Sequence, residues 1–330
     1  MKPHILVVGG AGYIGSHMVK CLDRAGFVPI VLDNLSQGKR DAVGKARLIV
    51  CDLGDASALE VIFQAFPIAA VMHFASFIQV GESVREPGKY YDNNVGNTVR
   101  LLQAMLRHGV GKFIFSSTAA IFGDPQYVPI DENHPKRPIN PYGRSKTMVE
   151  EILDDFDRAY ALRSVCLRYF NAAGADEQTE LGERHEPETH LIPLVLQAAS
   201  GRRQTLTIYG RDYATPDGTC VRDYVHVMDL CDAHLLALER LLEGGASARF
   251  NLGNGNGYSI GQVIAAAESV TGRSIQTLYG PRRLGDPPTL VADASQARKV
   301  LRWAPRFAEL DLIIEHAWRW EKKMTSLEVR

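Results

Sequence analysis

The sequence lacks the features that mark disulfide-bonded, membrane-spanning and nucleic-acid-binding proteins. Its five cysteines are scattered among 330 residues without a Cys-x-x-Cys pair, which favours reduced thiols in a cytoplasmic protein. No run approaches the roughly 18 consecutive apolar residues of a membrane-spanning helix. The formal net charge is −1, so no excess of basic charge argues for nucleic acid as a partner. The ten histidines form no metal-ligand spacing with the cysteines, and we predict no metal site.

The first half of the chain alternates short apolar segments with amphipathic ones. Both faces of the apolar segments are hydrophobic, which is typical of parallel strands covered by helices. Between them, residues 142–160 carry apolar side chains at helical steps. This alternation predicts an α/β fold with a doubly wound parallel sheet of the Rossmann type. The predicted strands are Ile5–Val8, Val28–Leu32, Arg47–Val50, Ala69–Phe74, Lys112–Ser116 and Ser164–Arg168.

The second half is more irregular. Residues Ala173–His190 are polar and rich in Gly and Glu, which indicates a loop or linker. A helix is expected at Leu191–Ser200, and short strands at Thr205–Tyr209 and Arg249–Leu252. At roughly 100–200 residues per domain, we expect two domains. The first spans residues 1–172, and a smaller mixed α/β substrate domain spans residues 173–330, from which some segments can return to the first.

A glycine-rich turn follows the first predicted strand. Either Gly10 or Gly9, taken with Gly12 and Gly15, gives a dinucleotide-binding spacing, and a helix follows. Such glycines let backbone N–H groups approach a pyrophosphate at a helix N-terminus.

Two acidic residues end the next strands. Asp33 ends the second predicted strand, where a carboxylate accepts hydrogen bonds from ribose hydroxyls and repels a 2′-phosphate, which favours NAD over NADP. Asp52 follows the third strand; it faces the adenine or caps the next helix, and both readings stay open.

A tyrosine and a lysine four residues apart open the helix at 142–160. Tyr142 and Lys146 therefore share one helical face. An ordinary tyrosine has a pKa near 10, and nearby positive charge from Lys146 and an oxidised nicotinamide would lower it toward 7. Such a tyrosine could take the proton of a substrate hydroxyl. Thr118, in a run of hydroxyls at the end of the fifth strand, is placed to hydrogen-bond that substrate hydroxyl; a helix cap is the alternative for this run. We expect His73 and His226, in apolar runs, to be buried structural residues.

Together these motifs resemble the extended short-chain dehydrogenase/reductase family and, within it, the UDP-glucose 4-epimerases. The resemblance covers nearly the whole chain and includes Gly9–His17, Phe115–Thr118, Tyr142–Lys146, Arg168–Asn171 and Val221–Val227. It implies an NAD-dependent enzyme that inverts C4 of a UDP-hexose through a transient 4-keto sugar, with Tyr142 as the base. It also implies a homodimer formed through the segments 94–108 and 142–160.

The resemblance assigns further residues to the site. The cofactor-binding residues it implies are Gly9, Gly12, Tyr13, Ile14, Gly15, Asp33, Asn34, Leu35, Ser36, Gln37, Gly38, Asp52, Leu53, Phe74, Ala75, Asn93, Thr118, Tyr142, Lys146 and Phe170. The substrate-binding residues it implies are Thr118, Tyr142, Asn171, Leu191, Thr207, Tyr209, Arg222, Arg283, Asp286 and Leu290. The arginines offer forked donors that suit phosphate oxygens.

Departures from the family pattern leave alternatives open. Leu290 stands where a bulky tyrosine can restrict the sugar pocket, so a UDP-N-acetylhexosamine is a possible substrate, and a UDP-pentose is not excluded. Ala119 and Ala120 stand where a 4,6-dehydratase needs an acidic pair, which argues against that reaction. A non-catalytic NAD-sensing regulator would not need Tyr142, Lys146 and Thr118 together.

Overall fold

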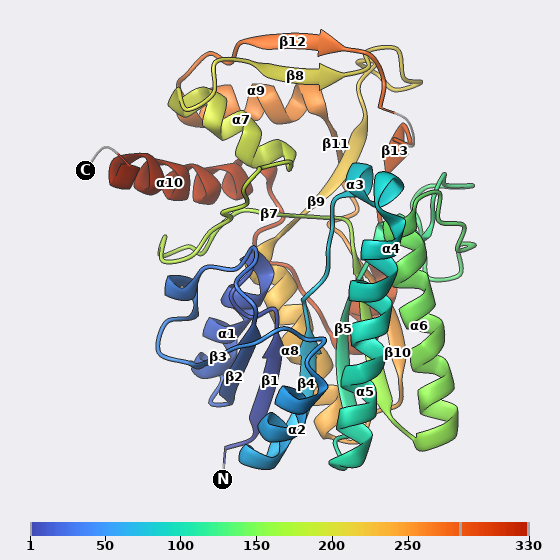
Figure 1. Cartoon of the computed structure of the whole chain (residues 1–330). Coiled ribbons are helices and arrows are strands. Elements are labelled where there is room, and N and C mark those ends of the chain that lie inside the picture. Colours follow the sequence, from blue (N-terminus) through green and yellow to red (C-terminus); the bar gives the residue numbers. More distant parts are fainter. Residues whose placement is uncertain (1, 284–285, 329–330) are drawn as a thin grey trace.

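A computed structural model describes residues 2–283 and 286–328, and its largest element is a parallel sheet (Figure 1). Seven strands lie in the order β10-β6-β5-β4-β1-β2-β3, and each neighbouring pair is parallel. The strand order reverses between β1 and β4, and ligands of such sheets bind at this switch point, beyond the carboxyl ends of the strands. The strands are β1 His4–Val8, β2 Val28–Asp33, β3 Arg47–Val50, β4 Ile68–His73, β5 Lys112–Thr118, β6 Arg163–Tyr169 and β10 Ala248–Leu252.

Helices cover both faces of this sheet because alternate strand residues point to opposite sides. Ile5 and Val7 of β1 pack in a core with α1 and α8, whereas Leu6 and Val8 pack in a second core with α2, α5 and α6. These helices are α1 Tyr13–Arg24, α2 Ala56–Ala65, α5 Asn97–Arg107, α6 Pro141–Tyr160 and α8 Val227–Leu242. Shorter helical segments are η1 Arg40–Val43, α3 Val80–Arg85, α4 Pro87–Tyr90, η2 Tyr91–Gly96, η3 Ala119–Ile121 and η4 Ala297–Leu301.

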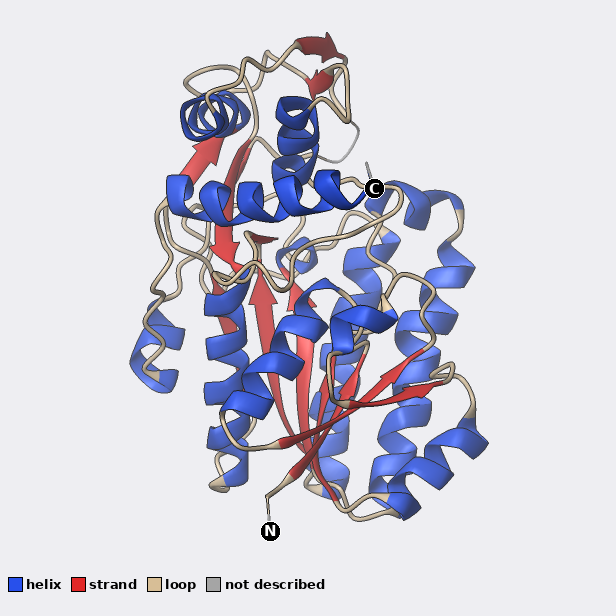
Figure 2. Ribbon diagram, turned by 90° about the vertical axis from the view of Figure 1, so that its left-hand side faces the viewer, coloured by secondary structure: helices blue, strands red, loops and turns tan. Residues whose placement is uncertain are grey.

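A smaller layer of helices and strands lies beyond the carboxyl edge of the sheet (Figures 1 and 2). It has its own apolar core, to which α7, α9 and α10 contribute. Strand β9 pairs with β7, β11 and β13, and β8 pairs with β12. The elements are β7 Asn171–Ala173, α7 Leu191–Ser200, β8 Leu206–Tyr209, β9 Val221–His226, β11 Gly257–Ser259, α9 Ile260–Thr271, β12 Thr277–Gly280, β13 Thr289–Leu290 and α10 Leu310–Glu328.

The predicted α/β class, doubly wound sheet and strand positions are confirmed, with strand ends within one or two residues. Residues 174–190 contain no helix or strand, as expected of a loop. Strand β10 lies beside β6 in the seven-stranded sheet, although its residues come late in the chain. The division at residue 172 stays a prediction. Among the described residues, no helix is both long and apolar enough to cross a membrane.

Candidate active site

The glycine turn between β1 and α1 is shaped for close backbone approach. A Cβ on Gly15 would lie 2.1 Å from the Gly9 carbonyl oxygen, so only glycine fits there. Gly10 is close-packed as well, because a Cβ there would lie 2.8 Å from Val31 of β2, so both glycine spacings stay open. Helix α1 begins after Gly12 without a side-chain cap. The N–H groups of the first turn of a helix have no intrahelical acceptors, so this end of α1 suits an anion.

Asp33 lies at the end of β2 beside this turn. Its carboxylate accepts hydrogen bonds from the backbone N–H groups of Ala11 at 2.9 Å and Leu35 at 2.8 Å, and it is buried. These bonds fix the carboxylate next to the glycine turn, where a ribose hydroxyl would meet it. The glycine turn and Asp33 together fit a dinucleotide without a 2′-phosphate. The loop after Asp33 carries Asn34, Leu35, Ser36, Gln37 and Gly38, of which Gln37 lines a shallow pocket with Gly12 and Tyr13.

Asp52 does not cap the following helix. The cap of α2 is Asp55, which accepts from the N–H of Ala58 at 3.0 Å. Asp52 instead accepts from the Asn34 amide and from the N–H of Gly54, each at 2.8 Å. The cap alternative for Asp52 is therefore wrong, and contact with an adenine stays a prediction. The neighbouring side chain of Leu53 is buried in the core beneath α2.

The residues expected near the nicotinamide come from three separate elements. Phe74 follows β4, and its ring lies 4.9 Å from that of His234. Ala75 is next in the chain, and its N–H would lie 2.6 Å from a Cβ on Gly9, which places it against the glycine turn. Asn93 is in η2 and donates to Asn94 at 2.9 Å. Phe170 follows β6 and packs with a small apolar cluster that also includes Leu290.

Tyr142 and Thr118 meet because the start of α6 packs tightly on the end of β5. Asn140 caps α6 by accepting from the N–H of Gly143 at 2.8 Å. A Cβ on Gly143 would lie 2.4 Å from the Ala120 carbonyl oxygen, so glycine permits this approach. The Thr118 hydroxyl accepts from the N–H of Ala120 at 3.1 Å and so caps η3. Thr118 is thus itself the cap, and its side chain also hydrogen-bonds the Tyr142 phenol.

Lys146 is held on the same helix, one turn further on. Its ammonium donates to the Ser76 hydroxyl and to the Ser116 carbonyl oxygen, each at 2.8 Å. It also lies 4.7 Å from the centre of the Phe115 ring. The side chain is buried, and burial lowers the pKa of Lys146 to about 7.

Burial dominates the electrostatics of the Tyr142 phenol in the protein alone. Burial raises the pKa of Tyr142, and a hydrogen bond with the Thr118 side chain offsets only part of that rise. Lys146 donates elsewhere and is not among the causes that act on the phenol. In the protein alone desolvation therefore dominates. The expectation that Lys146 and an oxidised nicotinamide together lower the phenol's pKa concerns the site with its cofactor, and it stays a prediction.

The predicted substrate residues gather in the smaller layer, above the sheet edge. Arg222 of β9 lies opposite Leu290 of β13 in register, and its guanidinium is 3.6 Å from the Asp286 carboxylate. Arg283 donates to Asp286 at 2.8 Å and lies over the Tyr209 ring. The structure therefore brings these five residues together. The remaining three lie on neighbouring elements: Asn171 in β7, Leu191 at the start of α7, and Thr207 in β8.

Sequence reasoning missed several residues that build this site. Ser76 and the Ser116 carbonyl fix Lys146, and Asn94 joins the loop after β4 to α6 by bonding both Phe77 and Ser145. Only Asn140 had a local signal, because an Asn followed by Pro marks a helix start. The predicted burial of His73 and His226 is confirmed.

Comparisons with known proteins agree with this geometry. Residues 5–253 match the NAD dependent epimerase/dehydratase family. The UDP-glucose 4-epimerase of Halalkalibacterium halodurans is 50% identical over 319 residues, covering 97% of this chain and 96% of that protein.

Two solved structures are similar over the same extent. One is a Brucella ovis UDP-glucose 4-epimerase in complex with NAD, with a TM-score of 0.94, 48% identity and coverage of 97% of this chain and 98% of that one. The other is the Bifidobacterium longum enzyme in complex with NAD+ and UDP, with a TM-score of 0.92, 38% identity and the same coverage. The chain belongs to the NAD dependent epimerase/dehydratase family.

Proposed function

We propose that this protein interconverts UDP-glucose and UDP-galactose by inverting C4 of the hexose, with NAD as its cofactor. The observation that carries the proposal is the packing of Gly143 on Ala120, which places Tyr142 and Thr118 together at the carboxyl edge of the sheet. That edge also holds the glycine turn and Asp33, and the relatives with about half of their residues identical are UDP-glucose 4-epimerases.

Each residue of the catalytic group has a separate task in the proposed reaction. Tyr142 removes the proton from the 4-hydroxyl, and Thr118 donates a hydrogen bond to the same oxygen. NAD, when bound at the glycine turn, would accept a hydride and return it. Because burial raises the phenol's pKa, Tyr142 needs positive charge in the loaded site to act as a base near neutral pH. Lys146, fixed by Ser76, is one source of that charge.

In the proposed reaction the smaller layer binds the nucleotide tightly, whereas the sugar is held loosely at the edge of the sheet. Arg222 and Arg283 are placed to bind the diphosphate, and both are already oriented by Asp286. Inversion requires the 4-keto sugar to present its other face to the cofactor, which would then return the hydride to C4. Binding energy concentrated on the UDP, remote from C4, would retain the intermediate while leaving the sugar free to turn.

Turnover without added cofactor tests the proposal. Purified protein is incubated with UDP-galactose, and UDP-glucose formation is followed. In Tyr142→Phe we expect bound NAD to be unchanged and turnover to fall roughly 10²–10⁴-fold, as for a lost general base. Tyr160→Phe, at the exposed end of the same helix, is the matched control and should be unaffected. Near-normal turnover in Tyr142→Phe would remove the assignment of the base.

A second substrate class is favoured by one observation. Leu290 packs, as does Phe170, against an apolar cluster that begins directly after β5, where the sugar would lie, and it is smaller than a tyrosine. We propose that UDP-N-acetylhexosamines also fit; failure to turn over UDP-N-acetylglucosamine would exclude this.

Two further proposals follow from the family resemblance. We propose a homodimer formed through the segment of η2 with α5 and through α6, which lie side by side on one face of the sheet (Figure 1). Sedimentation velocity would give a single-chain mass if this is wrong.

A cytoplasmic location also stays a proposal, which the five free cysteines support.

A further inference from the structure

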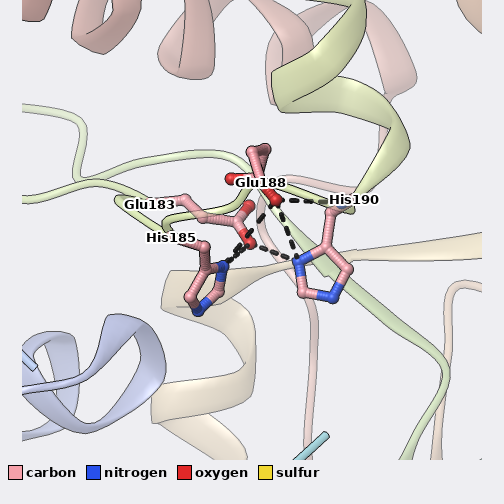
Figure 3. Close-up of side chains that lie close together, drawn as sticks. All are labelled: Glu183, His185, Glu188 and His190. Atoms are coloured by element: carbon pink, nitrogen blue, oxygen red, sulfur yellow. Dashed lines mark hydrogen bonds and ion pairs between the residues drawn. The ribbon is translucent and has the colours of Figure 1, made fainter. Parts of the chain in front are cut away.

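Four side chains from one loop converge outside the catalytic group. Glu183, His185, Glu188 and His190 lie in the loop before α7 and direct one donor atom each to a common point, with all four atoms within 4.8 Å of one another (Figure 3). Both glutamate side chains are only 5% exposed. The His190 side chain is 43% exposed. Two carboxylates and two imidazoles brought together form a donor set that metal ions use.

The spacing of the donors matches a four-coordinate ion. With metal–ligand bonds of about 2.0–2.1 Å, neighbouring donors of a tetrahedral site lie about 3.4 Å apart. Here Nδ1 of His185 is 2.9 Å from Glu183 and 3.8 Å from Glu188, and Nδ1 of His190 is 3.9 Å from Glu188. Nδ1 of His190 also contacts Glu183. Small shifts of side chains would therefore place all four donors on one ion.

The surroundings fix these ligands in place. The Glu188 carboxylate accepts from the backbone N–H groups of Thr189 at 2.7 Å and His190 at 2.9 Å. The carbonyl oxygen of Glu183 accepts from the Trp320 indole at 3.0 Å, which ties the loop to α10. Nδ1 of His185 is buried, makes no hydrogen bond of good geometry, and has the Glu183 carboxylate as its ion-pair partner at 2.9 Å. Such outer contacts orient ligands, and the imidazole nitrogens already face the two carboxylates between which an ion would bind.

We propose that Glu183, His185, Glu188 and His190 bind one divalent transition-metal ion, Zn²⁺ before others, in a closed structural site. Imidazole nitrogens favour Zn²⁺ over Mg²⁺ or Ca²⁺, which prefer oxygen ligands alone. Two carboxylates neutralise the charge of the ion. The proposal replaces the sequence expectation of no metal site, which considered histidines only in combination with cysteines. It does not depend on the proposed reaction.

The location gives this ion a structural task. The His185 ring lies 6.4 Å from that of Tyr13, edge to face, at the start of α1. Next to it, Arg184 forms two hydrogen bonds with Asp41, at 3.0 and 2.7 Å. His190 immediately precedes α7. A bound ion would thus hold the loop across the glycine turn and join it to the smaller layer.

Ion pairs between protonated histidines and the glutamates would hold the same side chains without a metal, and titration with Zn²⁺ distinguishes the two cases. The full-length protein is freed of metal with a chelator and titrated calorimetrically with ZnCl₂, with MgCl₂ as a negative control. We expect one Zn²⁺ per chain. Loss of a residue that only orients a ligand costs about 10–100-fold in metal affinity. His185→Gln/His190→Gln, which removes two ligands, should therefore lose at least about 100-fold.

A matched variant and a direct location complete the test. His4→Gln/His108→Gln removes two histidines elsewhere and should bind Zn²⁺ like the wild type. Anomalous diffraction at the zinc edge should place the ion between the four side chains of the wild-type protein, which decides the matter even if the double variant does not fold. Equal affinity in the wild type and the folded ligand variant, or a zinc peak only at other positions, would overturn the proposal.

Discussion

A single methyl group at position 143 should disable the catalytic group while leaving the protein folded. A Cβ there would lie 2.4 Å from the Ala120 carbonyl oxygen. Carbon–oxygen contacts of this kind are found at about 3.3–3.6 Å. In Gly143→Ala the start of α6 must therefore retreat by about 0.9 Å from the end of β5, and Tyr142 moves away from Thr118 with it.

The expected loss of activity follows from this displacement. Misplacement of a reacting group by about 1 Å can cost roughly 10²-fold in rate, which corresponds to about 2.7 kcal/mol. The effect on stability is smaller, because overpacking costs about 1–3 kcal/mol and alanine regains up to about 1 kcal/mol of helix propensity. We expect kcat to fall by roughly 10²-fold and the thermal midpoint by only a few degrees.

Steady-state kinetics and thermal unfolding measure the two quantities on the same samples. Gly88→Ala is the matched control, since a Cβ on Gly88 in the helix α4 would meet nothing within 4 Å. That variant should keep its activity and its stability. Wild-type kcat in Gly143→Ala at an unchanged thermal midpoint would refute the view that this contact positions Tyr142.

Three more predictions concern other groups of the site. Burial lowers the pKa of Lys146 to about 7, so between about pH 7 and pH 10 the unfolded chain binds a proton that the folded chain does not. The stability of the wild type to urea should therefore rise over that range relative to that of Lys146→Met. Parallel curves of stability against pH would contradict this. In Asp33→Asn, the N–H of Ala11 or of Leu35 loses an acceptor, and an unsatisfied donor costs about 1–3 kcal/mol. We therefore expect less NAD to be retained per chain after gel filtration. Retention equal to that of the wild type would speak against Asp33 as a ribose ligand. Leu290→Tyr should reduce turnover of UDP-N-acetylglucosamine at least about 10-fold relative to UDP-glucose, and an unchanged ratio of kcat/KM would show that this position does not limit the pocket.

Local pattern was sufficient for much of the fold and part of the site. Continuous apolar runs located the strands, and the glycine turn and Tyr142–Lys146 lie at the sheet edge because parallel strands end there together. Contacts between segments far apart in the sequence could not be predicted from local pattern. The Tyr13 hydroxyl donates to the Gly174 carbonyl at 2.7 Å, across 161 positions of sequence, and no periodicity encodes such a pair.

Electrostatic effects and loop geometry were harder to predict. The direction of the pKa shift of Tyr142 in the protein alone depends on how deeply the phenol is buried and on its hydrogen bond with Thr118, and neither follows from a spacing of four. The convergence of Glu183 and His190 depends on the path of a loop without regular structure. Packing, rather than local propensity, decides both.

The late position of β10 in the chain has a consequence for biosynthesis. Its partner β6 ends at Tyr169, but β10 begins at Ala248, so the ribosome must make the intervening residues before the sheet is complete. At about 5–20 residues per second, this interval is on the order of ten seconds. Throughout it, β6 presents an unpaired hydrophobic edge of the kind that recruits other nascent chains. Expression of residues 1–172 alone would make that exposure permanent, and such a fragment should aggregate.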